Sequence, residues 1–305
     1  MMSLIDHVER YLALRRAIGF KLVDQERMLQ SFARRASEQG EDHVCAETAV
    51  AWAAESRSQL ERHRRLSVVA RFTEFLHAED PAHEIPQKDL FYTRQHRPTP
   101  HIFSEEDIAA IISRAEELGP AGSLRPLAFS TMFGLMAVAG LRTKEVIELL
   151  ISDFTDDGLL IRETKFRKSR FIPLHETTKT QIERYIGMRC RVAGQTDHLF
   201  VSLHRKKFSR HTVLSTFHEV CERAGIGRTI AGKRPRLLDL RHTFAVRALE
   251  RCPTGRDQVN RHMLALTTYM GHAGVESTYW YLERTPQLLR DIADAAETFV
   301  AGGGS

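Results

Sequence analysis

Apolar residues recur at helical spacing along most of the chain, whereas short extended runs are confined to one region. Within the first eighty residues this spacing predicts four amphipathic helices joined by short connections, an arrangement that favours a small bundle. The four predicted helices cover residues 5–17, 22–36, 46–54 and 58–78.

Between residues 79 and 100 the helical pattern stops, and prolines accumulate among polar residues. Proline stiffens a connecting segment but supports the interior of neither a helix nor a sheet. We therefore predict a domain boundary here. The expected order is an N-terminal helical domain over residues 1–85, a linker over 86–103, a second domain over 104–299 and a tail over 300–305.

The second domain is predicted to be mainly helical, with a small β-sheet. Ser104 is a predicted N-cap because three acidic residues follow it, and Asp239 is the predicted N-cap of a later helix. Two short runs, 159–163 and 170–174, are predicted strands joined by a basic hairpin tip. The other predicted helices cover residues 104–117, 124–139, 143–149, 177–188, 211–224, 264–271 and 286–299.

Composition excludes several classes of protein. The chain has 305 residues, 42% of them apolar, which suffices for two domains with a core each. No run approaches the roughly 18 apolar residues of a membrane helix, and the first twenty residues contain no signal-peptide core. The four cysteines are scattered without a C-x-x-C pair, so they indicate reduced thiols rather than disulfides or a zinc site. We expect a cytoplasmic protein without a membrane partner.

Positive charge is concentrated in one block of the chain. Residues 161–290 contain 25 Lys and Arg against 11 Asp and Glu, a net charge of +14, while the whole chain carries +5. A block of this size indicates a polyanionic partner, although a solvated basic face is the alternative.

Local clusters supply the candidate phosphate contacts. The cluster over residues 204–210 is dense rather than patterned, which favours contact with phosphates over reading of bases. The arginines of the fourth helix suit phosphate contact and a solvated face equally well. The candidates are Arg62, Arg64, Arg65, Lys168, Arg205, Lys206, Lys207, Arg210, Lys233, Arg234 and Arg236.

Four residues indicate chemistry on a phosphate. Arg142 is expected at a helix entry next to a glycine turn and Arg241 in the first turn of an apolar helix, and two guanidiniums offer planar paired donors that match phosphate oxygens. Tyr281 is a candidate covalent nucleophile, but a phenol with a pKa of about 10 needs neighbours that stabilise charge. His272 and Arg241 would be such neighbours. The ordinary alternatives are a surface ion pair of Arg142 with Glu145, a histidine buried for packing and a tyrosine in the core.

The same residues stand in the order and spacing of a known family. The strings A-G-L-R-T-K-E-V and L-D-L-R-H-T-F-A are followed by G-H and by Tyr281 in a G-H-x8-Y register. This pattern resembles the tyrosine recombinases, the phage-integrase family, over roughly residues 104–299. The register selects Tyr281 over its rivals Tyr279 and Tyr269. The N-terminal helices match the family's core-binding, SAM-like bundle in type.

The resemblance implies a DNA recombinase with an α+β catalytic domain. A lysine on the hairpin would protonate the leaving oxygen, with Lys168 as the rival candidate. Tyr281 would attack a scissile phosphate and give a 3′-phosphotyrosyl link with a free 5′-hydroxyl. The ester conserves the bond energy, so neither a cofactor nor a metal is implied. The implied catalytic residues are Arg142, Lys165, Arg241, His272 and Tyr281.

The resemblance also implies partners and a biological role. Double-stranded DNA with inverted half-sites would be bound by a dimer or tetramer that associates through the C-terminal helix. A resemblance to recombinases encoded in adjacent sets adds other recombinases to the expected partners. The implied role is integration or excision of a mobile element, in the cytoplasm on the nucleoid.

One position departs from the family pattern. Leu238 stands where the family has the histidine of H-x-x-R, and leucine can neither donate a hydrogen bond nor move a proton. His242 stands where the family usually also has a histidine, for which the resemblance implies a structural role. If the helix extends back to Leu238, His242 lies one turn away on the same face and could substitute in part. The alternative function is therefore a catalytically impaired, DNA-binding accessory subunit. A topoisomerase-like relaxing enzyme and an unrelated helical RNA-binding protein are further alternatives.

Overall fold

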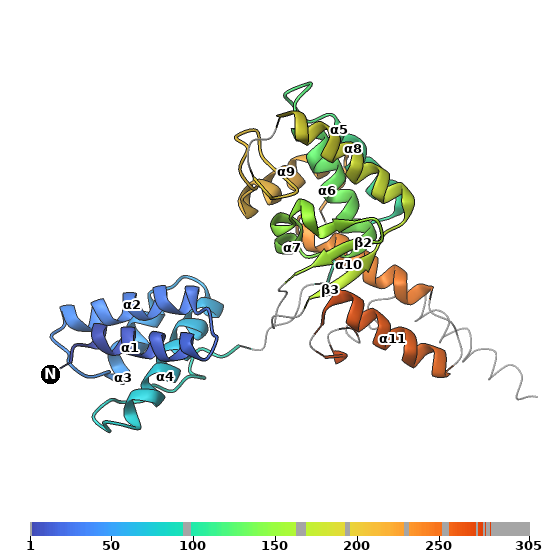
Figure 1. The fold of residues 1–305 in the computed structure, drawn as a ribbon. Helices are drawn as coiled ribbons and strands as arrows, with labels where there is room; N and C mark the ends of the chain where they lie inside the picture. The colour runs from blue at the N-terminus through green and yellow to red at the C-terminus, as the bar shows by residue number, and fades with distance from the viewer. Residues whose placement is uncertain are drawn as a thin grey trace, which may run out of the picture. The chain divides into compact units, whose positions relative to one another are not determined.

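The computed structural model is drawn in Figure 1. It describes residues 2–93, 99–162, 169–192, 196–228, 232–251, 256–272, 274–276, 278 and 281. Helix makes up 61% of the chain and the described strands form one small antiparallel sheet, so the predicted mainly helical fold class is confirmed. Contacts divide the chain into two compact units, Met1–Arg97 and Pro98–Ser305. Over the described ranges, no helix combines the length and the apolar character needed to cross a membrane.

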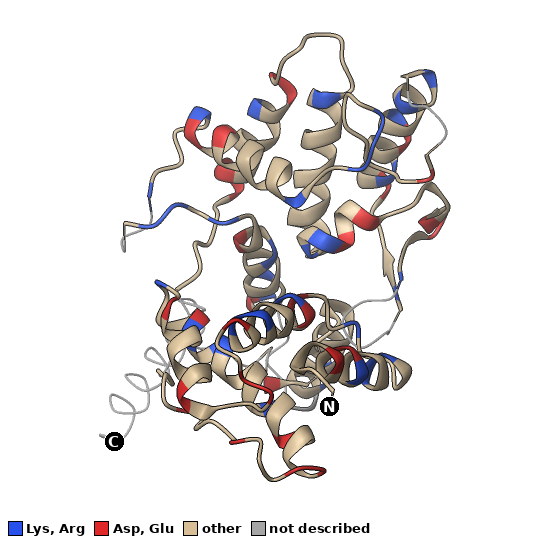
Figure 2. Ribbon diagram, turned by 90° about the vertical axis from the view of Figure 1, so that its left-hand side faces the viewer, with Lys and Arg blue, Asp and Glu red and all other residues tan. Residues whose placement is uncertain are grey.

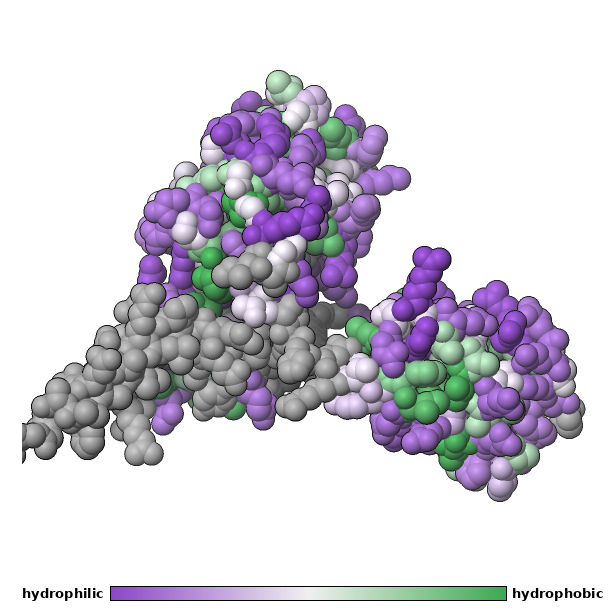
Figure 3. Space-filling view, turned by 180° about the vertical axis from the view of Figure 1, so that it is seen from behind, coloured by the Kyte–Doolittle hydropathy of each residue, from purple (hydrophilic) through white to green (hydrophobic). Residues whose placement is uncertain are grey.

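The N-terminal unit is a bundle of four helices around an apolar core. Leu29, Phe32 and Phe72 are fully buried between the helices, and burial of each such side chain contributes about 1.5–3 kcal/mol. In Figure 3 a patch of apolar side chains interrupts the mostly hydrophilic face of this unit. Each predicted helix is present, with ends within two residues of those expected: α1 (Leu4–Ala17), α2 (Val23–Glu38), α3 (Ala46–Ala54) and α4 (Gln59–His77).

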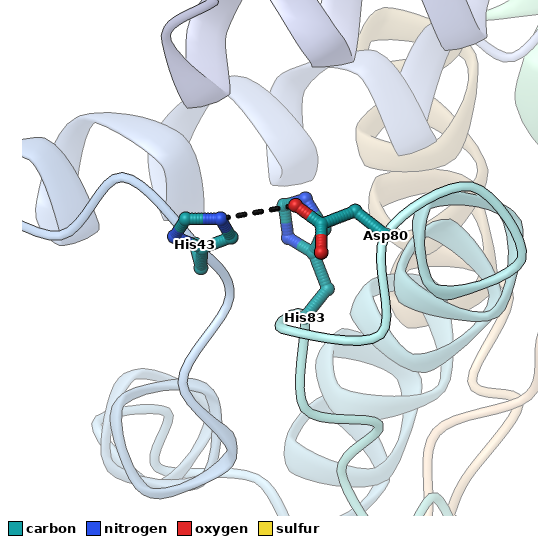
Figure 4. A group of neighbouring side chains, drawn as sticks. All are labelled: His43, Asp80 and His83. Carbon is teal, nitrogen blue, oxygen red and sulfur yellow. Dashed lines mark hydrogen bonds and ion pairs between the residues drawn. The ribbon is translucent and has the colours of Figure 1, made fainter. Parts of the chain in front are cut away.

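Three polar side chains meet where the segment after α4 passes the entry to α3 (Figure 4). His43, Asp80 and His83 offer ligand-type atoms within 4.8 Å of one another. However, the backbone N–H of Val44 donates to His83 Nδ1 over 3.1 Å, so neutral His83 carries its proton on Nε2 and has no lone pair for a metal ion. His43 Nε2 donates to Asp80 Oδ2 over 3.1 Å. The group therefore fits a hydrogen-bonded cluster that joins two segments rather than a metal centre.

The hydrogen bond to His83 makes the stability of the N-terminal unit depend on pH. Burial lowers the pKa of His83, and the neighbouring His43 adds to the effect. The unfolded chain takes up this proton near pH 6.5, whereas the folded unit does so only at lower pH. The stabilisation is therefore complete above about pH 6.5 and is lost as the pH falls through the folded-state pKa. We expect denaturant titrations to show lower stability at about pH 5 than at about pH 7.

The fluorescence of Trp52 in a Trp280→Phe background reports this unit, because these are the two tryptophans of the chain. His83→Asn retains an acceptor for the Val44 N–H but does not titrate in this range. The variant should therefore lose less stability on acidification than the parent chain. Equal losses in the two proteins would show that His83 is not the group responsible.

The C-terminal unit is built around α6 (Arg125–Ala139), in which 11 of 15 residues are buried. A helix that is apolar on all sides belongs in an interior. Both α5 and α10 contact α6, which brings α10 to the centre of the unit. The other helices in the described ranges are α5 (Glu105–Glu116), α7 (Thr143–Glu148), α8 (Glu176–Val192), α9 (Arg210–Arg223), α10 (Leu237–Glu250) and α11 (Arg256–Met270).

The sheet lies beside α7 and has three antiparallel strands in chain order (Figure 1). Leu159 pairs with Ile172, and both side chains are buried. Two of these strands were predicted; the additional β1 has two residues, too few to show an alternating pattern. The predicted hairpin tip, residues 163–168, lies outside the described residues. The strands are β1 (Phe154–Thr155), β2 (Gly158–Ile161) and β3 (Arg170–Pro173).

Some predicted helix ends were wrong. Asp239 is the third residue of α10 rather than its N-cap, and its carboxylate accepts the N–H of the actual N-cap residue, Arg236, over 2.8 Å. Helix α11 begins at Arg256, eight residues before the predicted start, because its first two turns are mainly polar and show no apolar period. Helix α8 continues four residues beyond its predicted end. The predicted helix over 286–299 lies outside the described residues.

Candidate functional site

A glycine turn carries the chain from α6 to the first candidate arginine. Gly140 ends α6 with φ of +58°, and a Cβ at this position would lie 2.5 Å from the Phe244 ring. Both the left-handed conformation and the close approach of α10 therefore require glycine. Arg142 follows two residues later as the N-cap of α7, while Arg241 lies on α10 and is 2% exposed.

Backbone carbonyls hold the guanidinium of Arg241. Nη1 donates to Gly140 O over 2.5 Å, and Nη2 donates to Met270 O over 2.6 Å. Nη2 also lies 3.2 Å from His272 Nε2. Burial lowers the pKa of Arg241 to about 10, and Arg142 adds to the effect, so the group stays a cation near neutral pH. These contacts use three of its five N–H groups, which leaves a buried cation able to donate to an anionic ligand.

Glu145 lies between two arginines. Arg142 Nη1 donates to Oε1 over 2.7 Å, while Arg170 donates to Oε1 over 3.0 Å and to Oε2 over 2.7 Å. Burial by itself would raise the pKa of Glu145, but the two guanidiniums, Arg170 first, lower it to about 2. The ion pair of Arg142 with Glu145 is thus half-buried and belongs to the site, rather than being an ordinary surface pair.

Gly271 lets two guanidiniums approach the backbone after α11. Its φ is +63°, and a Cβ would lie 2.8 Å from Arg170 Nη1 and 3.5 Å from Arg142 Nη1. Arg142 Nη2 donates to the Gly271 carbonyl over 2.9 Å. Glycine is needed here for its conformation and for the missing side chain. The turn places His272 directly beside the arginines.

The hydrogen bonds of His272 determine its tautomer. A guanidinium only donates, so Nε2 accepts from Arg241 and the ring proton lies on Nδ1. Nδ1 then donates to Thr278 Oγ1 over 2.9 Å. Burial lowers the pKa of His272 to about 4, and the charge of Arg241 adds to the effect. The imidazole is therefore neutral near pH 7, and an incoming anion would raise its pKa.

Tyr281 is buried beside two imidazoles. Its side chain is 3% exposed, and its ring is parallel to that of His272, with 10° between the planes and 6.1 Å between the centroids. Its hydroxyl oxygen lies 3.1 Å from Nδ1 of His242. His242 is buried as well, and burial lowers its pKa to about 4. Sequence spacing gave His242 a conditional role; the fold puts it against the phenol.

The resulting site is cationic and partly enclosed. Three guanidiniums, those of Arg142, Arg170 and Arg241, and one carboxylate, that of Glu145, give the site a net charge of +2. Paired donors of this kind suit the oxygens of a phosphate, and fixed donors stabilise charge that develops during a reaction. Glu145 is held by two guanidiniums, which makes its oxygens poor ligands for a cation.

Two predicted positions remain to be located, the hairpin lysine and Leu238. Lys165, with its rival Lys168, lies outside the described residues. Leu238 lies in the first turn of α10, because that helix begins at Leu237, before the predicted N-cap Asp239. The side chain of Leu238 is 41% exposed. His242, one turn further along α10, is by contrast 9% exposed. The two positions are near each other on the helix surface, but the imidazole points inward and the leucine outward.

The predicted phosphate contacts of the C-terminal unit are mostly on its surface. Exposed ion pairs join Lys207 to Glu148 and Arg234 to Glu222, and such pairs are weak enough for a phosphate to compete. Figure 2 shows Lys and Arg interspersed with Asp and Glu over both units. The Arg236 guanidinium pairs with the buried carboxylate of Asp239. The same carboxylate also accepts the backbone N–H of Arg236 at the start of α10. The remaining exposed candidates are Arg205, Lys206, Arg210 and Lys233.

In the N-terminal unit the three candidate arginines already bind backbone carbonyls or a carboxylate of the same unit. Arg62 Nε donates to Ser56 O over 2.6 Å. Arg65 donates to Trp52 O over 3.3 Å and lies over the Trp52 ring, 5.0 Å from its centroid. Arg64 is exposed and pairs with Asp24 over 2.9 Å. Arg64 therefore has the most accessible guanidinium of the three.

Sequence reasoning missed Arg170 as a site residue. Arg170 was predicted as the first residue of a strand, but its side chain is 9% exposed and bound to Glu145. The available signal was its position at the start of a strand whose neighbours are apolar. Its partner is 25 residues away, so no local spacing connects the two.

The chain resembles known proteins in sequence and in fold. The phage integrase family model matches residues 102–287. The chain is 33% identical to the integrase/recombinase y4rB of Sinorhizobium fredii, over 93% of this chain and 94% of that protein. Its fold is similar to that of the XerH site-specific recombinase in a post-cleavage complex with palindromic difH substrate (TM-score 0.65, 14% identity, 88% of this chain and 78% of that one). It is also similar to a lambda integrase tetramer bound to a Holliday junction (TM-score 0.63, 17% identity, 92% of this chain and 76% of that one).

Proposed function

The chain belongs to the phage integrase family, and on that premise we propose that it is a site-specific DNA recombinase that works through a 3′-phosphotyrosyl intermediate. The observation that supports this most strongly is the buried cation Arg241, bound to backbone carbonyls and to His272, whose ring lies parallel to that of Tyr281. A buried guanidinium with N–H groups to spare is suited to a phosphate. A phenol beside it is suited to attack on that phosphate.

Each site residue has a proposed role. Arg142 and Arg241 bind the non-bridging oxygens of the scissile phosphate and stabilise the added charge of the pentacoordinate transition state. His272 binds the same phosphate, and Lys165 protonates the leaving 5′-oxygen. Tyr281 forms the ester to the 3′-phosphate. A 5′-hydroxyl of the partner strand then reverses the step, and the ester conserves the energy of the bond throughout.

The proposed substrate is double-stranded DNA with inverted half-sites at the ends of a mobile element, which is integrated or excised. The exposed basic residues around the start of α9 would contact phosphates and make binding strongly dependent on salt. Helical residues 1–85 would hold the same DNA, joined by the linker over 86–103 to a catalytic domain over 104–299. We further propose that copies of the chain, or other recombinases, assemble as a dimer or tetramer on the DNA through the helix over 286–299.

A catalytically impaired accessory subunit is the second candidate function. The exposed side chain of Leu238, three residues before Arg241, favours it, because leucine offers no hydrogen bond to a phosphate at that position. Covalent trapping separates the two candidates. Nicked duplexes tiling the DNA around the gene are incubated with the chain without metal and separated on a denaturing gel. A protein–DNA adduct supports the recombinase; DNA binding without any adduct supports the accessory subunit.

We expect Leu238→His to form the adduct about tenfold faster than the parent chain. A hydrogen bond to a charged group contributes about 1.5–3 kcal/mol, which corresponds to tenfold or more in rate when it acts on the transition state. Because Leu238 is exposed, stability should change by less than about 0.5 kcal/mol. Leu264→His, at a 62% exposed leucine of α11, is the matched control and should leave the rate unchanged. An unchanged rate in Leu238→His would mean that this position takes no part in the reaction.

A further inference from the structure

The hydroxyl of Tyr281 has a chemically suitable neighbour, His242, to which the family resemblance gives a structural role rather than a catalytic one. His242 Nδ1 lies 3.1 Å from Tyr281 Oη, and the ring centroids are 5.4 Å apart. Both side chains are at least nine-tenths buried. His242 follows Arg241 directly on α10, so the helix that supplies the buried cation also supplies this imidazole.

His242 is in a protonation state in which it can accept a proton. Burial lowers its pKa to about 4, so near pH 7 the ring is neutral and one nitrogen carries a lone pair. The charged groups that act on it are Asp239, which raises the pKa, and Arg236 and Arg241, which lower it. Negative charge that develops on the adjacent phenolic oxygen would raise the pKa of His242 during the reaction, because an opposite charge within a few ångströms favours the protonated form.

The side chain one turn earlier on α10, that of Leu238, cannot accept a proton. Leu238 contains no hydrogen-bonding group, and its side chain points outward at 41% exposure. The other nearby imidazole, His272, uses Nε2 to accept from Arg241 and donates from Nδ1 to Thr278. Of the two imidazoles beside Tyr281, His242 is thus the one in hydrogen-bond contact with the hydroxyl.

We propose that His242 is a catalytic residue whose Nδ1 takes the proton of Tyr281 Oη as that oxygen bonds to phosphorus. This inference rests on the proposed recombinase function. As the new O–P bond forms, the bond between phosphorus and the 5′-oxygen breaks, and that oxygen takes a proton from a separate acid, for which Lys165 is the proposed donor. In the reverse step His242 returns its proton to Tyr281, so protons and charge balance over the cycle.

The test compares His242→Asn with the parent chain in covalent trapping on nicked duplexes from the DNA around the gene. The asparagine amide can hydrogen-bond Oη from a position near that of Nδ1, but it cannot accept a proton. We expect the rate of adduct formation to fall about 100-fold or more, the usual contribution of general acid–base catalysis. Unfolding and DNA binding of the variant are measured alongside, and His242→Gln serves as a second variant if His242→Asn folds poorly.

A second substrate separates loss of the base from loss of the acid. In a duplex with sulfur in place of the 5′-bridging oxygen, the leaving thiolate needs no proton. Lys165→Ala should therefore recover adduct formation on this substrate, whereas His242→Asn should remain slow. A merely structural defect at His242 would appear as weaker DNA binding or lower stability.

The outcomes are distinguishable. If the parent chain forms no adduct on either substrate, the proposed recombinase function fails. If the parent chain forms the adduct and the folded His242→Asn variant matches its rate, the role of His242 fails while the function stands. A faster rate in His242→Asn would also overturn the proposal, because the hydrogen bond would then be holding Tyr281 in a resting position.

Discussion

Tyr281→Phe is expected to abolish covalent attachment of the chain to DNA, by at least about 10⁴-fold, while binding of the same DNA is retained. The substitution removes the one atom proposed to form the ester and keeps the ring that lies parallel to His272. The lost hydrogen bond to His242 leaves a buried imidazole nitrogen without this partner, which costs about 1–3 kcal/mol of stability. Adduct yield on denaturing gels and DNA affinity at fixed salt are the two measurements.

Tyr269→Phe is the matched control. This tyrosine stacks on Phe244 with 5.3 Å between centroids, and burial raises its pKa to about 12, so it is poorly suited to act as a nucleophile. The control should form the adduct at the parent rate. An adduct that persists in Tyr281→Phe would assign the nucleophile to another side chain, and Tyr279→Phe would then be the next variant to examine.

Arg241→Lys is expected to lower the rate of adduct formation by about 10²–10³-fold, the usual effect of removing one fixed donor to a developing charge. A single ammonium cannot reproduce the fork that reaches Gly140 O, Met270 O and His272 together. Each buried carbonyl that loses its donor costs about 1–3 kcal/mol, so the C-terminal unit should also unfold at lower temperature. Trapping kinetics and calorimetry measure the two effects separately.

Arg247→Lys provides the comparison on the same helix. Arg247 donates to a backbone carbonyl as well, that of Phe103 over 3.0 Å, but it lies away from the candidate site. The control should lose stability without a specific loss of rate in the folded protein. If Arg241→Lys and Arg247→Lys lose activity only in proportion to their stability, Arg241 has a structural role and the phosphate site lies elsewhere.

Local sequence patterns predicted most of the helices and strands and several residues of the candidate site. Helical spacing found the four N-terminal helices, and Ser104 was recognised as a cap because a cap acts within three residues of its own position. The same method failed at α11, whose first turns are mainly polar, and at β1, which has two residues. Such elements are stabilised by distant contacts and leave no periodic signal.

For the candidate site, too, prediction succeeded where the signal was local and failed where it depended on distant contacts. The motif spacing singled out Arg142, Arg241, His272 and Tyr281 and exposed the departure at Leu238, because each lies in a recognisable string. It did not reveal the role of Arg170 or the contact of His242 with the phenol. The first depends on a partner 25 residues away and the second on one 39 residues away.

The sequence by itself determined where helices form, where positive charge accumulates and which side chains have the chemistry of a phosphate site. Helix period, capping and composition act over a few residues, so they can be read along the chain. Only the tertiary structure decided which residues contact one another. Arg142 donates to the carbonyl of Gly271, 129 residues away, and Glu145 accepts from two arginines. Leu238 faces outward while His242 faces inward. These outcomes depend on how helices pack against one another, and packing combines contacts that no single stretch of sequence contains.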